Sequence, residues 1–152
     1  MGELTINRRQ AVRAAAGMAA GGLLVTGAGV GSASATGSSN GLVGSWLVTV
    51  KDENGDEGLV VASFIDGGVM ISNDIRPAGG VGTGSWEDKG DDKFKGTFWA
   101  GNPADDTSVK VEVWGKLKDD EISGHFEFTA YDSDGEEVAS GKGTFTGEPL
   151  DA

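Results

Sequence analysis

The stretch SVKVEVWGKLKDDEISGHFEFTAY, residues 108–131, decides the fold class of this chain. Apolar and polar residues alternate through both halves of the stretch, and the pair Asp119-Asp120 separates the halves. One face of the first half carries Val109, Val111, Val113 and Leu117, and one face of the second carries Ile122, Phe126, Phe128 and Ala130. Successive side chains of a β-strand point to opposite faces, so the stretch predicts a hairpin of two long antiparallel strands with one face buried.

The chain after Gly41 repeats this pattern of short apolar-periodic runs separated by turn residues. We expect eight strands, at residues 45–51, 59–65, 69–73, 83–88, 94–100, 108–117, 121–131 and 137–146. Each turn contains residues that tolerate positive φ, at Asn54-Gly55, Asp66-Gly67-Gly68, Lys89-Gly90-Asp91, Asp119-Asp120 and Asp134-Gly135. The predicted fold is all-β, a single eight-stranded antiparallel up-and-down β-barrel over residues 44–148 with a tail at 149–152. Closure of the barrel removes the exposed sheet edges.

The first 35 residues have a different character from the rest. Arg8 and Arg9 precede an apolar run from residue 14 to 30, and Ala33-Ser34-Ala35 follows the run. This pattern resembles a twin-arginine signal peptide, with cleavage expected after Ala35 and a flexible leader at residues 36–43. A transmembrane anchor is the alternative, but the run is short and rich in glycine. The resemblance implies that the protein is secreted after it has folded.

Composition excludes several classes of function. The chain carries 12 basic and 24 acidic residues, for a formal net charge of −12. The basic residues after the signal segment stand singly among carboxylates, so neither nucleic acid nor, after processing, a membrane surface is an expected partner. The chain has no cysteine, which excludes disulfides and thiolate chemistry. We expect no cofactor and no bound metal, and a monomer or a weak homodimer.

Glycines gather on the strand faces that the pattern assigns to the barrel interior. These are Gly82, Gly84, Gly96, Gly115, Gly124, Gly141 and Gly143. They either let strongly coiled strands bend at barrel corners or leave space inside. An eight-stranded barrel is just wide enough for packed side chains or for one small ligand.

The same interior faces bring together the aromatic residues of the predicted ligand cavity. Its expected lining is Trp46, Phe64, Trp86, Phe94, Phe98, Phe126, Phe128, Tyr131, Ser63 and Asn73, the last three supplying a few polar groups near the mouth. An apolar cavity with few polar groups favours recognition of a hydrophobic small molecule over acid–base chemistry.

Residues that could support common catalytic or metal chemistry are poorly placed. His125, the single histidine, falls on the strand face that we interpret as outward, which favours a solvated side chain over a general base. One histidine without cysteine cannot complete the usual zinc ligand set. The acidic runs at residues 52–57 and 132–137 look like calcium loops, but they stand where hairpin turns are needed and lack the spaced ligands.

Gly44-Ser45-Trp46 at the head of the first strand resembles the opening of lipocalins and other calycin barrels. The stretches at residues 67–73, 82–86 and 141–145 look like small secreted lipocalin-like proteins of actinobacteria, and the general plan is similar to allene-oxide-cyclase-like barrels. The resemblance implies a structural role for Trp46 at the barrel floor. It carries over no ligand or catalytic residue, because the basic residue that lipocalins place over this tryptophan has no clear equivalent unless Lys142 serves.

Three functions remain open at this point. The first is a binding protein for an apolar or amphipathic small molecule. The second is a cofactor-free cyclase or isomerase that folds a reactive substrate into a productive shape by proximity and orientation alone. The third is a filled barrel that acts through its surface, with Trp114 on the polar face of its strand as an exposed anchor.

Overall fold

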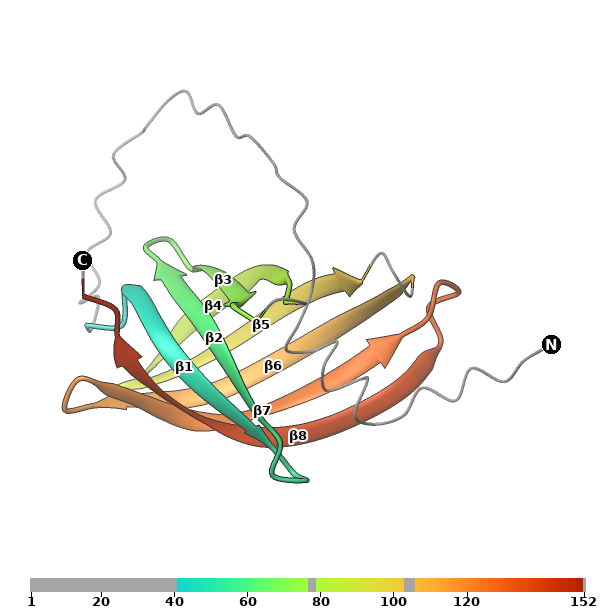
Figure 1. Ribbon diagram of the computed structural model, residues 1–152. Coiled ribbons are helices and arrows are strands. Elements are labelled where there is room, and N and C mark those ends of the chain that lie inside the picture. Colours follow the sequence, from blue (N-terminus) through green and yellow to red (C-terminus); the bar gives the residue numbers. More distant parts are fainter. Residues whose placement is uncertain (1–40, 77–78, 103–105, 152) are drawn as a thin grey trace.

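The computed structural model describes residues 41–76, 79–102 and 106–151, and these form a closed barrel of eight strands (Figure 1). The strands are β1 (Gly44–Asp52), β2 (Glu57–Ile65), β3 (Val69–Asp74), β4 (Val81–Gly90), β5 (Lys93–Asn102), β6 (Thr107–Lys118), β7 (Glu121–Tyr131) and β8 (Glu137–Pro149). Each strand pairs antiparallel with the next, so the predicted all-β fold, strand number and up-and-down order are confirmed. The described part of the chain contains no helix that could span a membrane.

Strand β1 closes the barrel because it pairs with both β2 and β8. Trp46 lies opposite Ala62 on one side and opposite Pro149 on the other. The last strand runs past the predicted end at residue 146, since Glu148 and Pro149 still pair with β1. The barrel is uneven in depth, with long curved strands β5 to β8 on one side and shorter strands β1 to β3 on the other (Figure 1).

The predicted alternation of inward and outward residues is confirmed in β6 and β7. The buried apolar core consists of Leu42, Trp46, Val48, Val60, Ala62, Phe64, Met70, Phe94, Phe98, Ala100, Val109, Val111, Val113, Ile122, Phe126, Phe128, Ala130 and Phe145. A chain of rings crosses the core near one end, with Phe64 edge-on to Trp86 at 5.7 Å and edge-on to Phe94 at 5.1 Å between centroids. Phe94 in turn lies 6.3 Å from Phe145.

Glycines lie opposite phenylalanines on neighbouring strands, and the phenylalanine rings fill much of the barrel interior. The paired residues are Phe94 and Gly115, Phe98 and Gly84, Phe126 and Gly143, Phe128 and Gly141, and Phe145 and Gly124. A Cβ added at Gly141 or Gly143 would stand 2.7 Å from the opposing ring. The glycines therefore receive aromatic rings from the neighbouring strand, and much of the room that they were expected to leave is filled.

Trp46 forms part of the barrel floor. Its side chain is 3% exposed, and the indole Nε1 donates a hydrogen bond to the carbonyl oxygen of Leu42 at 2.9 Å. Leu42 is itself buried, so packing begins inside the stretch that the sequence assigned to a leader. The predicted signal peptide at residues 1–35 and the leader up to residue 40 lie outside the described residues.

The hairpin turns have the backbone conformation that their residues predicted. Gly55, Gly67, Gly68, Gly90, Asp91, Asp119, Asp120 and Gly135 all have positive φ. In the two acidic runs, the carboxylate of the first aspartate accepts the backbone N–H groups of its own turn. Asp52 Oδ1 bonds Asn54 and Asp56, and Asp132 Oδ1 bonds Asp134 and Glu136. These runs are turns closed by their own aspartates, as expected.

Candidate ligand-binding cavity

A cavity of about 90 Å³ lies within the barrel and is partly open to solvent. It is lined by Val48, Val50, Asp52, Asp56, Glu57, Gly58, Val60, Ala62, Phe64, Met70, Ser72, Arg76, Phe94, Phe98, Val111, Val113, Ile122, Phe126 and Phe145. The apolar members come from the inward faces of β1, β2, β3, β5, β6, β7 and β8. The exposed residues Asp56 and Glu57 place its mouth beside the turn that joins β1 and β2.

Four of the predicted aromatic residues line this cavity, namely Phe64, Phe94, Phe98 and Phe126. Trp46 and Phe128 are buried in the core but do not border the space. Trp86 also lies outside the lining, and its Nε1 donates to the carbonyl oxygen of Ile65 at 3.0 Å.

The three predicted polar residues are placed elsewhere, which corrects their assignment to the mouth. Ser63 bonds Ser45 at 2.9 Å between hydroxyl oxygens on the outer face, and Asn73 is exposed. Tyr131 stacks on Trp99, with ring centroids 5.6 Å apart, also on the outer face. The run Val69 to Asn73 begins with three apolar residues, so the sequence showed no alternation from which to read the inward face.

The polar residues that do line the cavity were missed. They are Ser72 in its wall and Asp52, Asp56, Glu57 and Arg76 at its mouth. Once Met70 is known to point inward, the two-residue period of the strand places Ser72 and Asp74 inward as well. Arg76 lies beyond the end of β3, where no strand period applies, so no sequence signal marked it.

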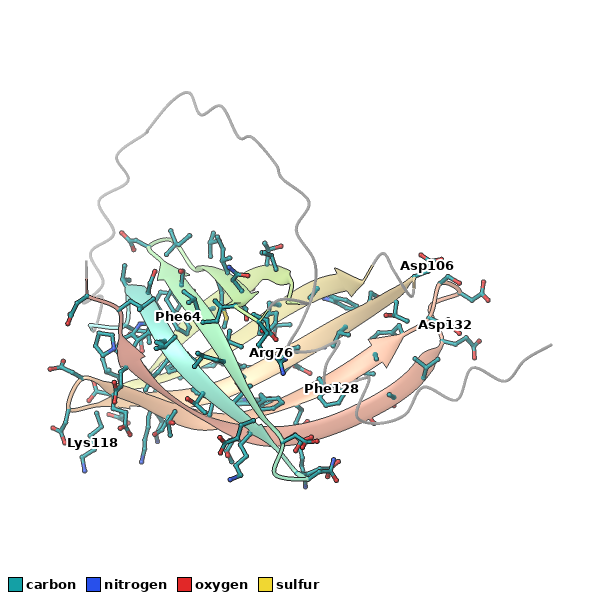
Figure 2. All side chains as sticks on the ribbon, viewed as in Figure 1. Phe64, Arg76, Asp106, Lys118, Phe128 and Asp132 are labelled. Atoms are coloured by element: carbon teal, nitrogen blue, oxygen red, sulfur yellow. The ribbon has the colours of Figure 1, made fainter. Side chains whose placement is uncertain are left out.

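Arg76 is held over the mouth by a buried carboxylate (Figure 2). Its Nε donates to both carboxylate oxygens of Asp74 at 3.0 Å, and its Nη2 donates to Asp74 Oδ2. The guanidinium lies beside Gly58, because a Cβ there would be 3.5 Å from its central carbon. Hydrogen bonding to Asp74 raises the pKa of Arg76 above its ordinary value, so the side chain stays charged at any working pH.

The other groups considered for catalysis do not face the cavity. His125 lies on the outer face, as expected, where its ring stacks on Trp114 at 5.1 Å between centroids. Trp114 is only half-exposed, and Lys95 Nζ lies 5.4 Å from its ring centroid. Within the described ranges, no group of three or more histidine or acidic residues is arranged to hold a metal ion.

Comparison with protein-family models and with curated proteins adds no relative from which a function could be transferred. No model of a protein family matches the chain, and no curated protein is similar enough to count as a match. The arrangement itself is an eight-stranded antiparallel barrel, which is consistent with a calycin-like fold. A fold of this kind supports many functions, so only the cavity can indicate the function of this barrel.

Proposed function

We propose that this protein binds a small apolar molecule inside the barrel. The observation that carries the proposal is the cavity, whose wall is apolar and aromatic and whose polar groups, apart from Ser72, gather at its mouth. Binding sites for small molecules commonly combine these two features. A cavity of about 150 Å³ holds a benzene ring, so a space of about 90 Å³ that is open on one side suits part of a small ring or the end of a longer molecule.

The proposal also covers the kind of protein and its location. We infer a secreted lipocalin-like barrel, supported by the calycin-like strand order and by the buried tryptophan at the head of β1. The twin-arginine segment lies outside the described residues, so export stays a prediction. The cyclase alternative stays a hypothesis as well, because shaping a substrate requires only a cavity of suitable form.

Cyclopentane is a suitable first probe because it is a small ring without polar atoms. Added to ¹⁵N-labelled protein, it should shift backbone amide resonances of β2, β3 and β5 around the cavity and saturate with concentration. The variant Ala62→Ile should weaken this binding at least tenfold, because its larger side chain occupies the space beside the wall. The fold should persist, since overpacking costs about 1–3 kcal/mol.

The matched control is Val61→Ile, which adds bulk at the neighbouring position on the outer face. It should bind cyclopentane like the parent protein. The proposal fails if the parent shows no saturable shifts, or if the inward and outward variants change binding equally.

A further inference from the structure

Ser72 is a buried polar side chain that the fold leaves without a partner. It is 9% exposed, and its hydroxyl makes no hydrogen bond with any of the described residues. No fully enclosed side-chain oxygen or nitrogen lacks a partner in this part of the chain, so the Ser72 hydroxyl is open to the cavity that it lines. A buried hydroxyl without a partner costs free energy, and a group that enters the cavity can supply the missing bond.

The neighbours of Ser72 leave the hydroxyl accessible. Its cross-strand partners are Ala62 on β2 and Gly82 on β4, which are both small. The rest of the wall around it is hydrocarbon, so the hydroxyl is the one polar group in the described wall below the mouth. A molecule with an oxygen atom at one end would be oriented by this hydroxyl.

Arg76 offers a second donor nearer the solvent. Asp74 engages Nε and Nη2 of the guanidinium, whereas Nη1 has no hydrogen-bond partner among the described residues. An arginine carries five N–H donors, so the pair with Asp74 leaves some of them available to a bound molecule. Ser72 and Arg76 thus both suit a hydrogen-bond acceptor.

The charge at the mouth decides which kind of acceptor fits. Asp52, Asp56 and Glu57 line it together with Arg76, and Asp74 already offsets the guanidinium. Carboxylates outnumber cations even when Lys51, which pairs with Glu57 at 3.3 Å, is included. An anionic head group would meet repulsion here, whereas an uncharged oxygen would not.

On this basis we propose that the ligand is a neutral molecule with an apolar body and a carbonyl or hydroxyl oxygen, which Ser72 and Arg76 bind. This inference rests on the proposed function, since it names the chemistry of a ligand in the same cavity. A fatty acid, whose head group is a carboxylate, is thereby disfavoured as the ligand.

Four small probes test the chemistry at nearly constant size: cyclopentanone, cyclopentane, cyclopentylammonium and cyclobutanecarboxylate. Their dissociation constants would be measured by amide shift titration on the parent and on Ser72→Ala. The substitution should weaken cyclopentanone binding roughly three- to tenfold, which is the range of one hydrogen bond, and should leave cyclopentane binding unchanged. Cyclobutanecarboxylate should bind the parent more weakly than cyclopentanone.

Two further variants separate a direct contact from a structural effect. Ser63→Ala removes a hydroxyl on the outer face of the neighbouring strand and should change the dissociation constant of none of the probes. Arg76→Lys keeps a cation for Asp74 but loses the additional N–H donors of the guanidinium. It should therefore weaken the binding of cyclopentanone and leave the binding of cyclopentane unchanged.

The outcomes distinguish this inference from the proposed function. If cyclopentane binds and Ser72→Ala affects it as much as cyclopentanone, the hydroxyl acts only through packing and the inference is wrong. If Ser72→Ala affects neither probe, the hydroxyl is satisfied by water and the inference is again wrong, while the cavity still binds. If no probe binds the parent, both proposals fall.

A second inference comes from the outer face of β1 to β4, which is independent of the cavity. The charged residues on this outward face are the ion pairs Lys51 with Glu57 and Glu87 with Lys89. The other outward residues are uncharged, and those that are apolar are Leu47, Leu59, Val61, Ile65, Val69, Ile71 and Val81. Leu47 lies opposite Val61, and Ile65 opposite Val69. Trp99 of β5, 49% exposed, borders this face opposite Thr83. The outer face of β5 to β8 also carries ion pairs, such as Lys95 with Glu112.

The charge of the chain indicates what covers this apolar face. Two copies of a protein with a net charge of −12 repel each other, and they meet at lowest electrostatic cost through a face whose few carboxylates are paired with lysines. We infer that the β1–β4 face is a contact between two copies related by a two-fold axis. The face is only about four strand spacings of ~4.8 Å wide, so the dimer should be weak and dissociate at micromolar concentration.

Sedimentation velocity from 1 to about 200 µM tests this contact. The parent should shift from monomer to dimer over this range, and the double variant Val69→Lys/Val81→Lys should remain monomeric because it places two charges on each face. Thr97→Lys/Thr129→Lys adds the same charge to the outer face of β5 to β8 and should still dimerise. A parent that is monomeric throughout, or a control that dissociates equally, would overturn the inference.

Discussion

Trp46→Ala should cost about 3–5 kcal/mol of the free energy of unfolding, which is the range for removing a buried aromatic ring. The indole is 3% exposed at the barrel floor, and its loss also leaves the carbonyl oxygen of Leu42 without its donor. Domains of this size are commonly stable by about 5–15 kcal/mol, so the variant should be marginally folded or unfolded at room temperature. Urea denaturation followed by circular dichroism measures the change.

Trp99→Ala is the matched control for this prediction. It removes the same ring from the outer face, where the side chain is 49% exposed and stacks on Tyr131. We expect a clearly smaller loss than for Trp46→Ala, because the side chain is already 49% exposed and its aromatic pair contributes only about 0.5–1.5 kcal/mol beyond the buried area. Equal losses for the two variants would show that Trp46 is not a core residue and that the register of β1 is wrong.

Gly124→Leu should destabilise the barrel by at least about 3 kcal/mol, the upper end of ordinary overpacking. A Cβ at this position would overlap the backbone carbonyl oxygen of Trp114 and stand 2.7 Å from the Cα of Gly115. It would also stand 2.9 Å from the ring of Phe145. Because backbone atoms cannot move aside as a side chain can, the β6–β7 pairing itself must shift. The melting temperature and the denaturant midpoint report the loss.

Gly101→Leu provides the comparison, because a Cβ there would meet no atom of the described residues within 4 Å. Its stability should stay within about 0.5 kcal/mol of the parent, as for most surface substitutions. A Gly124→Leu protein as stable as Gly101→Leu would mean that the interior beside β7 is open. That result would support the interpretation that the inward glycines leave free space in the barrel.

The barrel and its strand order could be read from local patterns in the sequence. The alternation in β6 and β7 specified which side chains face inward, and positive-φ residues such as Asp119 and Asp120 marked the turn between them. These are properties of neighbouring residues along one chain, so no tertiary information is needed. The outward position of His125 follows from the same alternation, and the structure agrees.

The candidate site could be predicted only in its apolar part. Phe94, Phe98 and Phe126 lie on strands with a clear period, and they line the cavity together with Phe64. In β3 the run Val69, Met70 and Ile71 has no period, so the sequence could not show that Ser72 faces inward and Asn73 outward. Arg76 follows the strand, and its position depends on a hydrogen-bonded pair with Asp74.

The sequence by itself therefore determined the strands, their turns and most inward rows, because each depends on the alternation of adjacent residues. Only the tertiary structure decided how much of the interior is empty. Most inward phenylalanine rings lie opposite a glycine, as Phe126 lies opposite Gly143, and such pairs form between strands whose register the sequence does not state. The cavity and its polar end are what remains after those rings have packed, so they depend on three-dimensional distances that no single strand contains.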